Sequence, residues 1–209
     1  MQPAGFRVNE ERPEDDFYPT PDNAIYTLLA HLSIPEGTCV HEPACGDGAI
    51  SKILERHPCI KKVISTDLND HGYGTPNCDF LTCNTPMPDW WLITNPPYKL
   101  AGEFLRKAFE LRYKRVIMFL RWDFLGSSKS REDILESGHL QRVLLMKERV
   151  TLFPKHFSKP KKGTSTYYSA WYIFDRDYKA PYQSEVIVRR VSLKQGEAYA
   201  KLFNSNHQG

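Results

Sequence analysis

The sequence predicts an α/β protein with a mostly parallel sheet and helices on both faces of that sheet. Short apolar runs such as 116–120 alternate along the chain with segments whose apolar residues recur every three or four positions. This alternation is typical of strands joined by crossover helices. With 209 residues, of which 41% are hydrophobic, the chain is long enough to bury the core of one domain.

The first half of the chain contains most of the predicted strands and helices. Residues 1–16 include five acidic side chains and are expected to form a flexible polar arm. Thr20-Pro21-Asp22 predicts the start of a helix, with Thr20 as the N-cap and Pro21 at the first helical position. Strands are expected at 39–41, 62–66, 90–94 and 116–120, and apolar stripes predict helices near 50–54 and 100–109.

The second half has a different pattern. Residues 140–145, 167–174 and 185–191 resemble strands, and few helix signals lie between them. They predict an antiparallel C-terminal edge, with a basic loop near 154–166 joining the first two strands. Because composition does not change sharply anywhere, residues 17–209 are expected to form a single domain.

Charge and cysteine content narrow the class of protein. The net charge is only +3, so overall charge does not require a nucleic-acid partner, although the acidic start and the basic stretch 147–162 hint at one basic face. The five cysteines include no C-x-x-C pair and no zinc-ligand spacing, which predicts free thiols, a reducing cytoplasm and no metal site. The polar start and the lack of a long apolar run predict neither a signal peptide nor a membrane span.

The most informative motif is Asn95-Pro96-Pro97-Tyr98, which follows an apolar strand. Two prolines remove two backbone N–H donors, so nearby carbonyls are left to accept hydrogen bonds from another group. The Asn95 side chain adds a second acceptor, and Tyr98 adds a flat ring. Together they predict a socket for a planar amino group, against the simpler interpretation of a proline-rich turn.

Acidic residues and glycines follow the other predicted strands. The segment 42–48, Glu-Pro-Ala-Cys-Gly-Asp-Gly, joins a strand to a helix, and its glycines allow close approach of a ligand. Asp67 lies about twenty residues farther on, where an acid can bind a ribose diol. Asp79-Phe80 can pair a carboxylate with an adenine amine. A capped turn, a turn aspartate and a core phenylalanine are the simpler interpretations of these three features.

These motifs resemble the S-adenosylmethionine-dependent DNA adenine-N6 methyltransferases, in particular small members carried by phages and prophages. The resemblance spans residues 17 to 175. It implies a Rossmann-like methyltransferase fold with a seven-stranded sheet, S-adenosylmethionine as cofactor, and double-stranded DNA as partner. Residues 17–21 resemble the segment that such enzymes fold over the methionine end of the cofactor. By resemblance, the cofactor-binding residues are Tyr18, Thr20, Pro21, Glu42, Pro43, Ala44, Cys45, Gly46, Gly48, Asp67, Leu68, Asp79 and Phe80.

The resemblance also implies roles in catalysis and substrate binding. Asn95, Pro96, Pro97 and Tyr98 would form the catalytic motif, with Tyr98 stacking on a flipped-out adenine. Little chain remains for a separate target-recognition domain, so the recognised DNA sequence is left open. The residues expected to hold the DNA are Trp122, Phe153, Lys155, Lys159, Lys161 and Lys162, for which a core tryptophan and a solvated basic loop are the alternatives.

Three other functions fit the same motifs. An RNA adenine-N6 methyltransferase would use the same socket on any exposed adenine. A protein glutamine methyltransferase uses the same tetrapeptide, but those enzymes carry an N-terminal helical domain for which this chain has no room. A catalytically silent binding subunit is the third, and it would not need to keep both the catalytic motif and the glycine turn.

Overall fold

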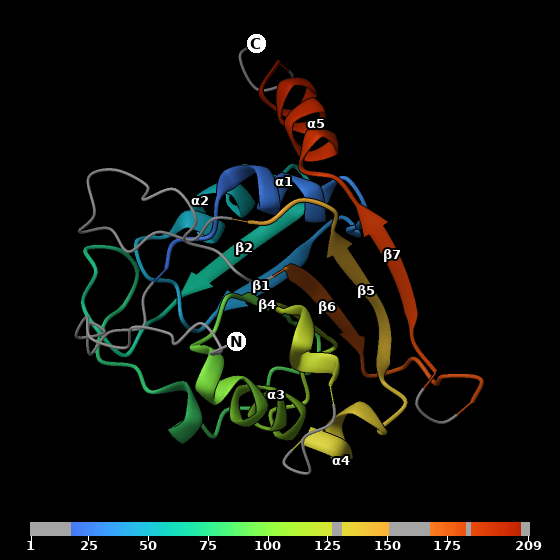
Figure 1. Cartoon of the computed structure of the whole chain (residues 1–209). Helices are drawn as coiled ribbons and strands as arrows, with labels where there is room; N and C mark the ends of the chain where they lie inside the picture. The colour runs from blue at the N-terminus through green and yellow to red at the C-terminus, as the bar shows by residue number, and fades with distance from the viewer. Residues whose placement is uncertain (1–17, 127–130, 151–167, 183–184, 206–209) are drawn as a thin grey trace, which may run out of the picture.

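The computed structural model describes residues 18–126, 131–150, 168–182 and 185–205 (Figure 1). The predicted polar arm at 1–16 and the basic loop at 154–166 lie outside these described residues.

The centre of the molecule is a seven-stranded sheet with the strand order β2-β1-β3-β4-β6-β5-β7. Neighbouring strands are parallel except where β6 pairs with β4 and with β5, so β6 alone is reversed. The predicted α/β class and its antiparallel C-terminal pairing are therefore confirmed, although the outermost strand β7 runs parallel to β5. The strands are β1 (Thr38–Glu42), β2 (Ile60–Ser65), β3 (Trp91–Thr94), β4 (Arg115–Arg121), β5 (Leu140–Met146), β6 (Ser169–Asp175) and β7 (Ile187–Val191).

Helices cover both faces of the sheet (Figure 1). Helices α1, α2 and α5 pack on one face, and α3 and α4 pack on the other. Three short 3-10 helices are also described: η1 lies between β2 and β3, η2 between β3 and α3, and η3 directly after β4. The helical elements are α1 (Asp22–Leu29), α2 (Ala49–Leu54), η1 (Phe80–Thr82), η2 (Tyr98–Leu100), α3 (Ala101–Glu110), η3 (Trp122–Leu125), α4 (Glu132–Leu135) and α5 (Leu193–Ser205).

The central strands supply both hydrophobic cores because their side chains alternate between the faces. In β4, Ile117 and Phe119 belong to the core under α1, α2 and α5, whereas Val116, Met118 and Leu120 belong to the core under α3. All of them are at most 1% exposed. A strand buried on both faces has a continuous apolar sequence, which is why this strand was predictable.

One local prediction is wrong, and one helix was not predicted. Helix α1 begins at Asp22 with Pro21 at the N-cap position and without a side-chain cap bond. Thr20 lies one residue before the N-cap position, so it is not the predicted N-cap; it is buried, with 3% of its surface exposed. The last described element is a helix, α5, which was not predicted from the sequence.

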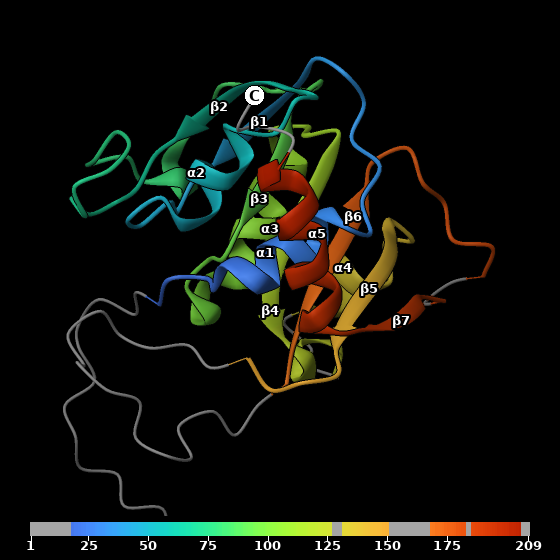
Figure 2. The same ribbon diagram turned by 90° about the horizontal axis from the view of Figure 1, so that it is seen from above.

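Helix α5 packs closely against α1, and the two helices lie side by side in both ribbon views (Figure 2). Gly196 makes this crossing possible, because a Cβ atom at that position would lie 2.2 Å from the Asn23 carbonyl oxygen. The Tyr26 ring packs against Phe203 with ring centroids 5.7 Å apart. From β6, the Trp171 indole N–H donates to the Ala24 carbonyl at 2.9 Å. Helix α1 is thereby fixed between the sheet and α5.

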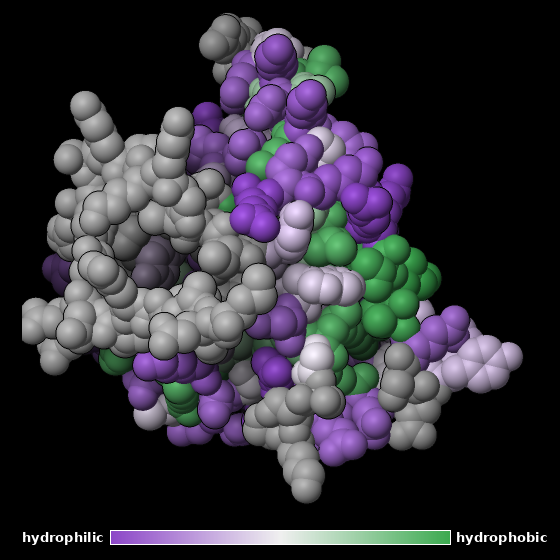
Figure 3. Space-filling model, in the orientation of Figure 1, coloured by the Kyte–Doolittle hydropathy of each residue, from purple (hydrophilic) through white to green (hydrophobic). Residues whose placement is uncertain are grey.

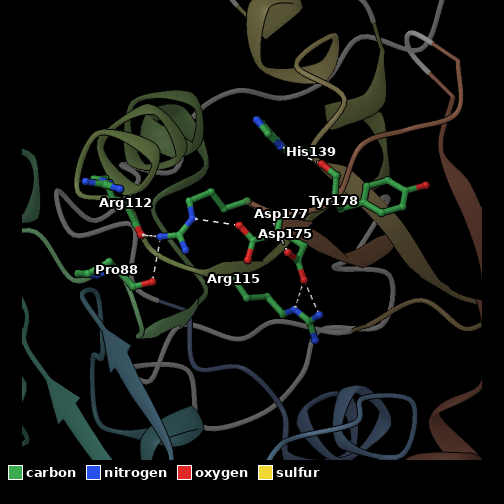
Figure 4. Close-up of polar contacts among 8 residues, drawn as sticks. Pro88, Arg112, Arg115, His139, Asp175, Asp177 and Tyr178 are labelled. Atoms are coloured by element: carbon green, nitrogen blue, oxygen red, sulfur yellow. Dashed lines mark hydrogen bonds and ion pairs between the residues drawn. The ribbon is translucent and has the colours of Figure 1, made fainter.

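A polar network lies where β4 begins and β6 ends (Figure 4). Arg115 at the start of β4 forms an ion pair with Asp175 at the end of β6, its Nε lying 3.0 Å from Oδ2. Arg176 donates to the carbonyls of Pro88 and Arg112 at 2.9 and 2.6 Å. These contacts tie the strand ends to the loop before β3 and the loop after α3.

The surface over β5 and β7 is hydrophobic (Figure 3), and no described helix lies over it in Figure 1. On β7, Ile187 and Val188 are 58% and 41% exposed. None of the described helices is both long enough and apolar enough to cross a membrane.

Candidate active site

A pocket lies at the carboxyl ends of β1, β2 and β3, where open α/β sheets bind their ligands. The segment before α1 supplies one wall, and the loops that follow the three strands supply the others. The residues that line it are Tyr18, Pro19, Thr20, Glu42, Pro43, Ala44, Cys45, Asp47, Ala49, Ile50, Asp67, Leu68, Asn69, His71, Cys78, Asp79, Phe80, Leu81, Asn95, Pro96, Pro97, Tyr98, Leu100 and Phe104. The structure thus brings the four residues of the Asn-Pro-Pro-Tyr motif to the same pocket as most of the predicted cofactor residues.

The two glycines of the turn after β1 shape the pocket without lining it. Gly46 and Gly48 have φ values of 52° and 82°, which favour glycine. A Cβ atom at Gly48 would lie 2.5 Å from the Tyr73 ring, so no larger residue fits there without displacing that ring. Gly46 donates its N–H to Asp67 Oδ2 at 2.8 Å. Pro21 is likewise outside the lining and caps α1.

Glu42 ends β1 as a carboxyl group with only 2% of its surface exposed. Its Oε2 accepts a hydrogen bond from the Ser51 N–H at 2.9 Å and a second, shorter one from the Ser51 hydroxyl. Burial raises the pKa of Glu42 well above its usual value, against the lowering effect of the Ser51 bonds; the nearby Asp67 and Asp47 raise it further. A cationic ligand group would favour the ionised form of this carboxyl.

The other two predicted acids also hold backbone groups in place. Asp67 accepts from the Asn69 N–H through Oδ1 at 2.9 Å, in addition to its bond from Gly46 through Oδ2. Asp79 accepts from the Leu81 N–H at 2.9 Å and so caps η1. Each carboxylate oxygen has two lone pairs, so these bonds orient the acids and still leave capacity to accept from a ligand.

Phe80 is both a core residue and a pocket residue. It is 2% exposed, and its ring lies 5.0 Å from Phe104 and 6.0 Å from His41, measured between centroids. His41 in turn bonds the Tyr113 hydroxyl at 2.5 Å and the Thr66 hydroxyl at 3.1 Å. Burial lowers the pKa of His41 to about 4, so this histidine is neutral at pH 7 and supports the floor of the pocket.

The Asn95 side chain has a defined orientation. Its Nδ2 donates to the Tyr18 carbonyl at 3.1 Å. Since a carbonyl only accepts, this contact requires the amide nitrogen on the Tyr18 side and leaves Oδ1 as the acceptor for another group. The bond joins residues 77 positions apart in sequence, and it connects the segment before α1 to the motif after β3.

The backbone of the motif offers a second acceptor. The Pro97 carbonyl accepts from the Leu100 N–H at 2.9 Å, which starts η2. In the part of the chain that the structure describes, no donor reaches the Pro96 carbonyl. Asn95 and Pro96, the residues that carry these two acceptors, are neighbours in the lining of the pocket, beside the half-buried Tyr98.

The predicted substrate residues are not gathered in this pocket. Trp122 is half-buried in η3 and packs against the core beneath α3, and it lines neither this pocket nor the one next to it. Phe153, Lys155, Lys159, Lys161 and Lys162 lie outside the described residues.

Sequence reasoning missed several lining residues in the loop after β2. Asn69, His71 and Cys78 line the pocket, and His71 Nε2 lies 3.8 Å from Asp67 Oδ1. Only their position after a strand end could have predicted them, because the loop has no regular spacing of hydrophobic residues. Over the described residues, no three His, Cys, Asp or Glu side chains form a metal-binding group.

Comparison with known proteins gives structural relatives only. No family profile and no curated protein matches the sequence. Among solved structures, the methyltransferase subunit of a type I restriction-modification system from Streptococcus thermophilus aligns with a TM-score of 0.63 and 14% identity, over 91% of this chain and 54% of that one. The fold is that of the Rossmann-like methyltransferases.

Two further structures of this fold align over more of their own length. A putative RNA methyltransferase from Pyrococcus horikoshii has a TM-score of 0.53 and 20% identity, covering 79% of this chain and 88% of its own. TrmK from M. capricolum, in complex with S-adenosylhomocysteine, has a TM-score of 0.51 and 10% identity, covering 77% and 71%. The chain thus spans about half of the restriction-modification subunit and most of these two proteins.

Proposed function

We propose that this protein transfers a methyl group from S-adenosylmethionine to the N6 amine of adenine in DNA. One observation carries the proposal. Asn95, Pro96 and Tyr98, which suit a planar amine, line the same pocket as the acids at the ends of β1 and β2. A cofactor pocket and an amine socket that share their walls are what a direct transfer between two bound molecules requires.

The residues present fit S-adenosylmethionine. Glu42 would face the ammonium of its methionine part. That positive charge would offset the free energy needed to keep a buried carboxylate ionised. Asp67 would accept from the ribose hydroxyls, and Asp79 with Phe80 would hold the adenine. When bound, this cofactor supplies a methyl group on a positively charged sulfur. The structural relative solved with the cofactor product S-adenosylhomocysteine has the same fold, which supports this assignment.

The chain's own groups would activate the amine. The lone pair of an adenine N6 is delocalised into the ring, so the amine is a poor nucleophile. If Asn95 Oδ1 and the Pro96 carbonyl accept its two hydrogens, they favour a tetrahedral nitrogen with its lone pair directed at the methyl carbon, about 3–3.5 Å away. The same two dipoles stabilise the positive charge that develops on N6. The methylated ammonium then loses a proton to water, so no strong base is needed.

Tyr98 would stack on the target base, which has to leave the helical stack of a duplex. Flipping a base costs a few kcal/mol and is needed for chemistry on an amine that is otherwise paired. The structural relatives are described both as restriction-modification and as RNA methyltransferases, so an RNA adenine is the main alternative substrate.

A transfer assay tests the proposal. The protein is incubated with S-adenosylmethionine carrying a labelled methyl group and with duplex DNA, single-stranded DNA, RNA or a mixture of proteins. The expected result is labelled N6-methyladenine in digested duplex DNA. Label in RNA or in protein, or N4-methylcytosine in place of N6-methyladenine, would contradict the proposed substrate. Cofactor binding without transfer to any of these would favour a silent binding subunit.

A further inference from the structure

A second pocket lies next to the first, at the carboxyl end of β4. Leu120 and Phe124 form its apolar floor, and Ala101, the first residue of α3, lines one side. Tyr98 lines both pockets and is therefore their common wall. The backbone beneath this rim is fixed, since the single hydrogen of the Tyr172 hydroxyl in β6 is shared between the carbonyls of Arg121 and Trp122, whose oxygens lie at 3.1 and 3.0 Å.

The remaining lining residues are mostly cationic. Lys99, Arg121 and Arg131 line the pocket, and Asp123 is its one acidic side chain. Asp123 is paired with Arg121, whose Nε lies 3.1 Å from Oδ1. Lys99 is exposed and has no ion-pair partner within the described residues. The pocket thus has an excess of positive charge beside an apolar floor, where electrostatic attraction is stronger than in open water.

Within the described residues, the Arg131 guanidinium forms no ion pair. Its guanidinium lies over the Phe124 ring, 4.7 Å from the centroid, and one terminal nitrogen donates to the Gly126 carbonyl at 3.3 Å. Its Nε is buried and has no hydrogen-bond partner in the described part of the chain. A buried donor without a partner costs free energy, and the negative charge of an anion in the pocket would offset that cost by attracting the whole guanidinium.

The position of this pocket, beside the proposed site for the target base, points to a phosphate of the nucleic acid as the anion. A phosphate is joined to its base through a single sugar, so a base stacked on Tyr98 in the first pocket brings its flanking phosphates close to the other side of that ring. We propose that the pocket formed by Lys99, Arg121 and Arg131 binds a phosphodiester group of the DNA strand next to the target adenine. This inference rests on the proposed function and adds a subsite that fixes the register of the strand.

Salt dependence of DNA binding tests the subsite. Affinity of the full chain for a short fluorescent duplex is measured at several salt concentrations for wild type, Lys99→Gln and Arg131→Gln. Each variant is expected to bind more weakly and to lower the slope of log K against log salt by about 0.9, as for one lost phosphate contact. Lys114→Gln is the matched control, because it removes the same charge at the opposite end of β4. Equal slopes for Lys99→Gln and Lys114→Gln would overturn the proposal.

A second measurement locates the phosphate. Once the methylated adenine has been mapped, duplexes are made with a neutral methylphosphonate at the linkage on either side of it. Wild type is expected to bind one of these duplexes more weakly than the unmodified duplex. Arg131→Gln, which already lacks the contact, is expected to bind that modified duplex almost as well as it binds the unmodified one. Losses that simply add would show that Arg131 and that linkage do not interact, and would refute the subsite.

The two proposals fail separately. Binding does not require transfer, so an absence of N6-methyladenine in DNA refutes the proposed function whatever the salt slopes are. Intact methylation with unchanged slopes refutes only the phosphate subsite. The melting temperature of each variant shows whether it is folded, and the exposed Lys99 keeps the test usable if Arg131→Gln is unstable.

Discussion

The two ends of the parallel strands use charged residues in opposite ways. At the amino end of β4, Arg115 is paired with Asp175, and Arg176 donates to two loop carbonyls (Figure 4). At the carboxyl ends, Glu42 is buried with a raised pKa, and Asn95, whose amide nitrogen donates to Tyr18, lines a pocket. The polar groups at one end are matched by the protein itself, and those at the other end are oriented by it but left able to bind a ligand.

This difference separates stability from activity. Paired, partly buried charges stabilise the fold only while both partners are present. Oriented acceptors at a pocket contribute little to the fold and stabilise a ligand or a transition state instead. Substitutions at the two ends should therefore change different measured quantities.

The largest expected effect is that of Asn95→Ala on transfer. Loss of one oriented acceptor at the reacting nitrogen should lower the single-turnover rate about 10²–10³-fold, while calorimetric affinity for S-adenosylmethionine stays close to that of wild type. Asn204→Ala, the same change at an exposed position of α5, should leave both unchanged. A near-normal rate for Asn95→Ala would mean that this amide does not hold the amine.

At the opposite end, Asp175→Asn should lower the stability of the fold and leave the rate of methyl transfer unchanged. The Arg115 and Asp175 side chains are 19% and 11% exposed, so removing one charge leaves the other poorly solvated, and urea unfolding at pH 7 should show a loss of about 2 kcal/mol. The transfer rate well below the melting temperature should not change. A tenfold slower rate would show that the two ends are coupled.

The loss of stability in Asp175→Asn should itself depend on pH. Burial acts to raise the pKa of Asp175, but hydrogen bonds from Arg115 and from the Asp177 N–H outweigh it and hold the pKa below its usual value. Such a group stabilises the fold above its unfolded pKa of about 3.9 and loses that contribution as pH falls through the folded value. The stability difference between wild type and Asp175→Asn should therefore shrink from pH 7 to pH 3. An undiminished difference would point to another cause.

The smallest expected effect is the most informative about the site. Glu42→Gln keeps an acceptor for Ser51 but removes the buried charge. Because burial raises the pKa of Glu42, ionising it costs stability as pH rises above its unfolded value, so the variant should gain stability relative to wild type between pH 5 and 8. It should also bind S-adenosylmethionine about tenfold more weakly, through loss of a charged hydrogen bond. Tighter or unchanged cofactor binding would remove Glu42 from the ligand contacts.

The central part of the fold could be predicted from the sequence because it depends on local pattern. Continuous apolar runs such as 116–120 mark strands buried on both faces. Helix α5 was missed because Gly196 weakens its helical signal, and the close contact with Asn23 that requires this glycine is visible only in three dimensions.

For the candidate site, sequence could place the motifs but not their contacts. Strand ends on the same side of a parallel sheet meet, so Glu42, Asp67 and Asn95 were expected near one another. The Asn95–Tyr18 bond joins distant segments, and the cationic residues of the pocket beside Tyr98 come from η2, from the end of β4 and from the position just before α4. No local pattern encodes such a combination.

The docking of α5 on α1 also bears on the order of events during synthesis. Tyr18 lies only four positions before α1, so the wall of the pocket that it forms depends on how firmly that helix is seated. On the ribosome, α1 emerges early, yet Phe203 and Gly196, which complete its packing, are translated more than a hundred residues later. A nascent chain therefore acquires its finished pocket only after α5 has been translated, and products that stop before residue 193 should lack the proposed transferase activity.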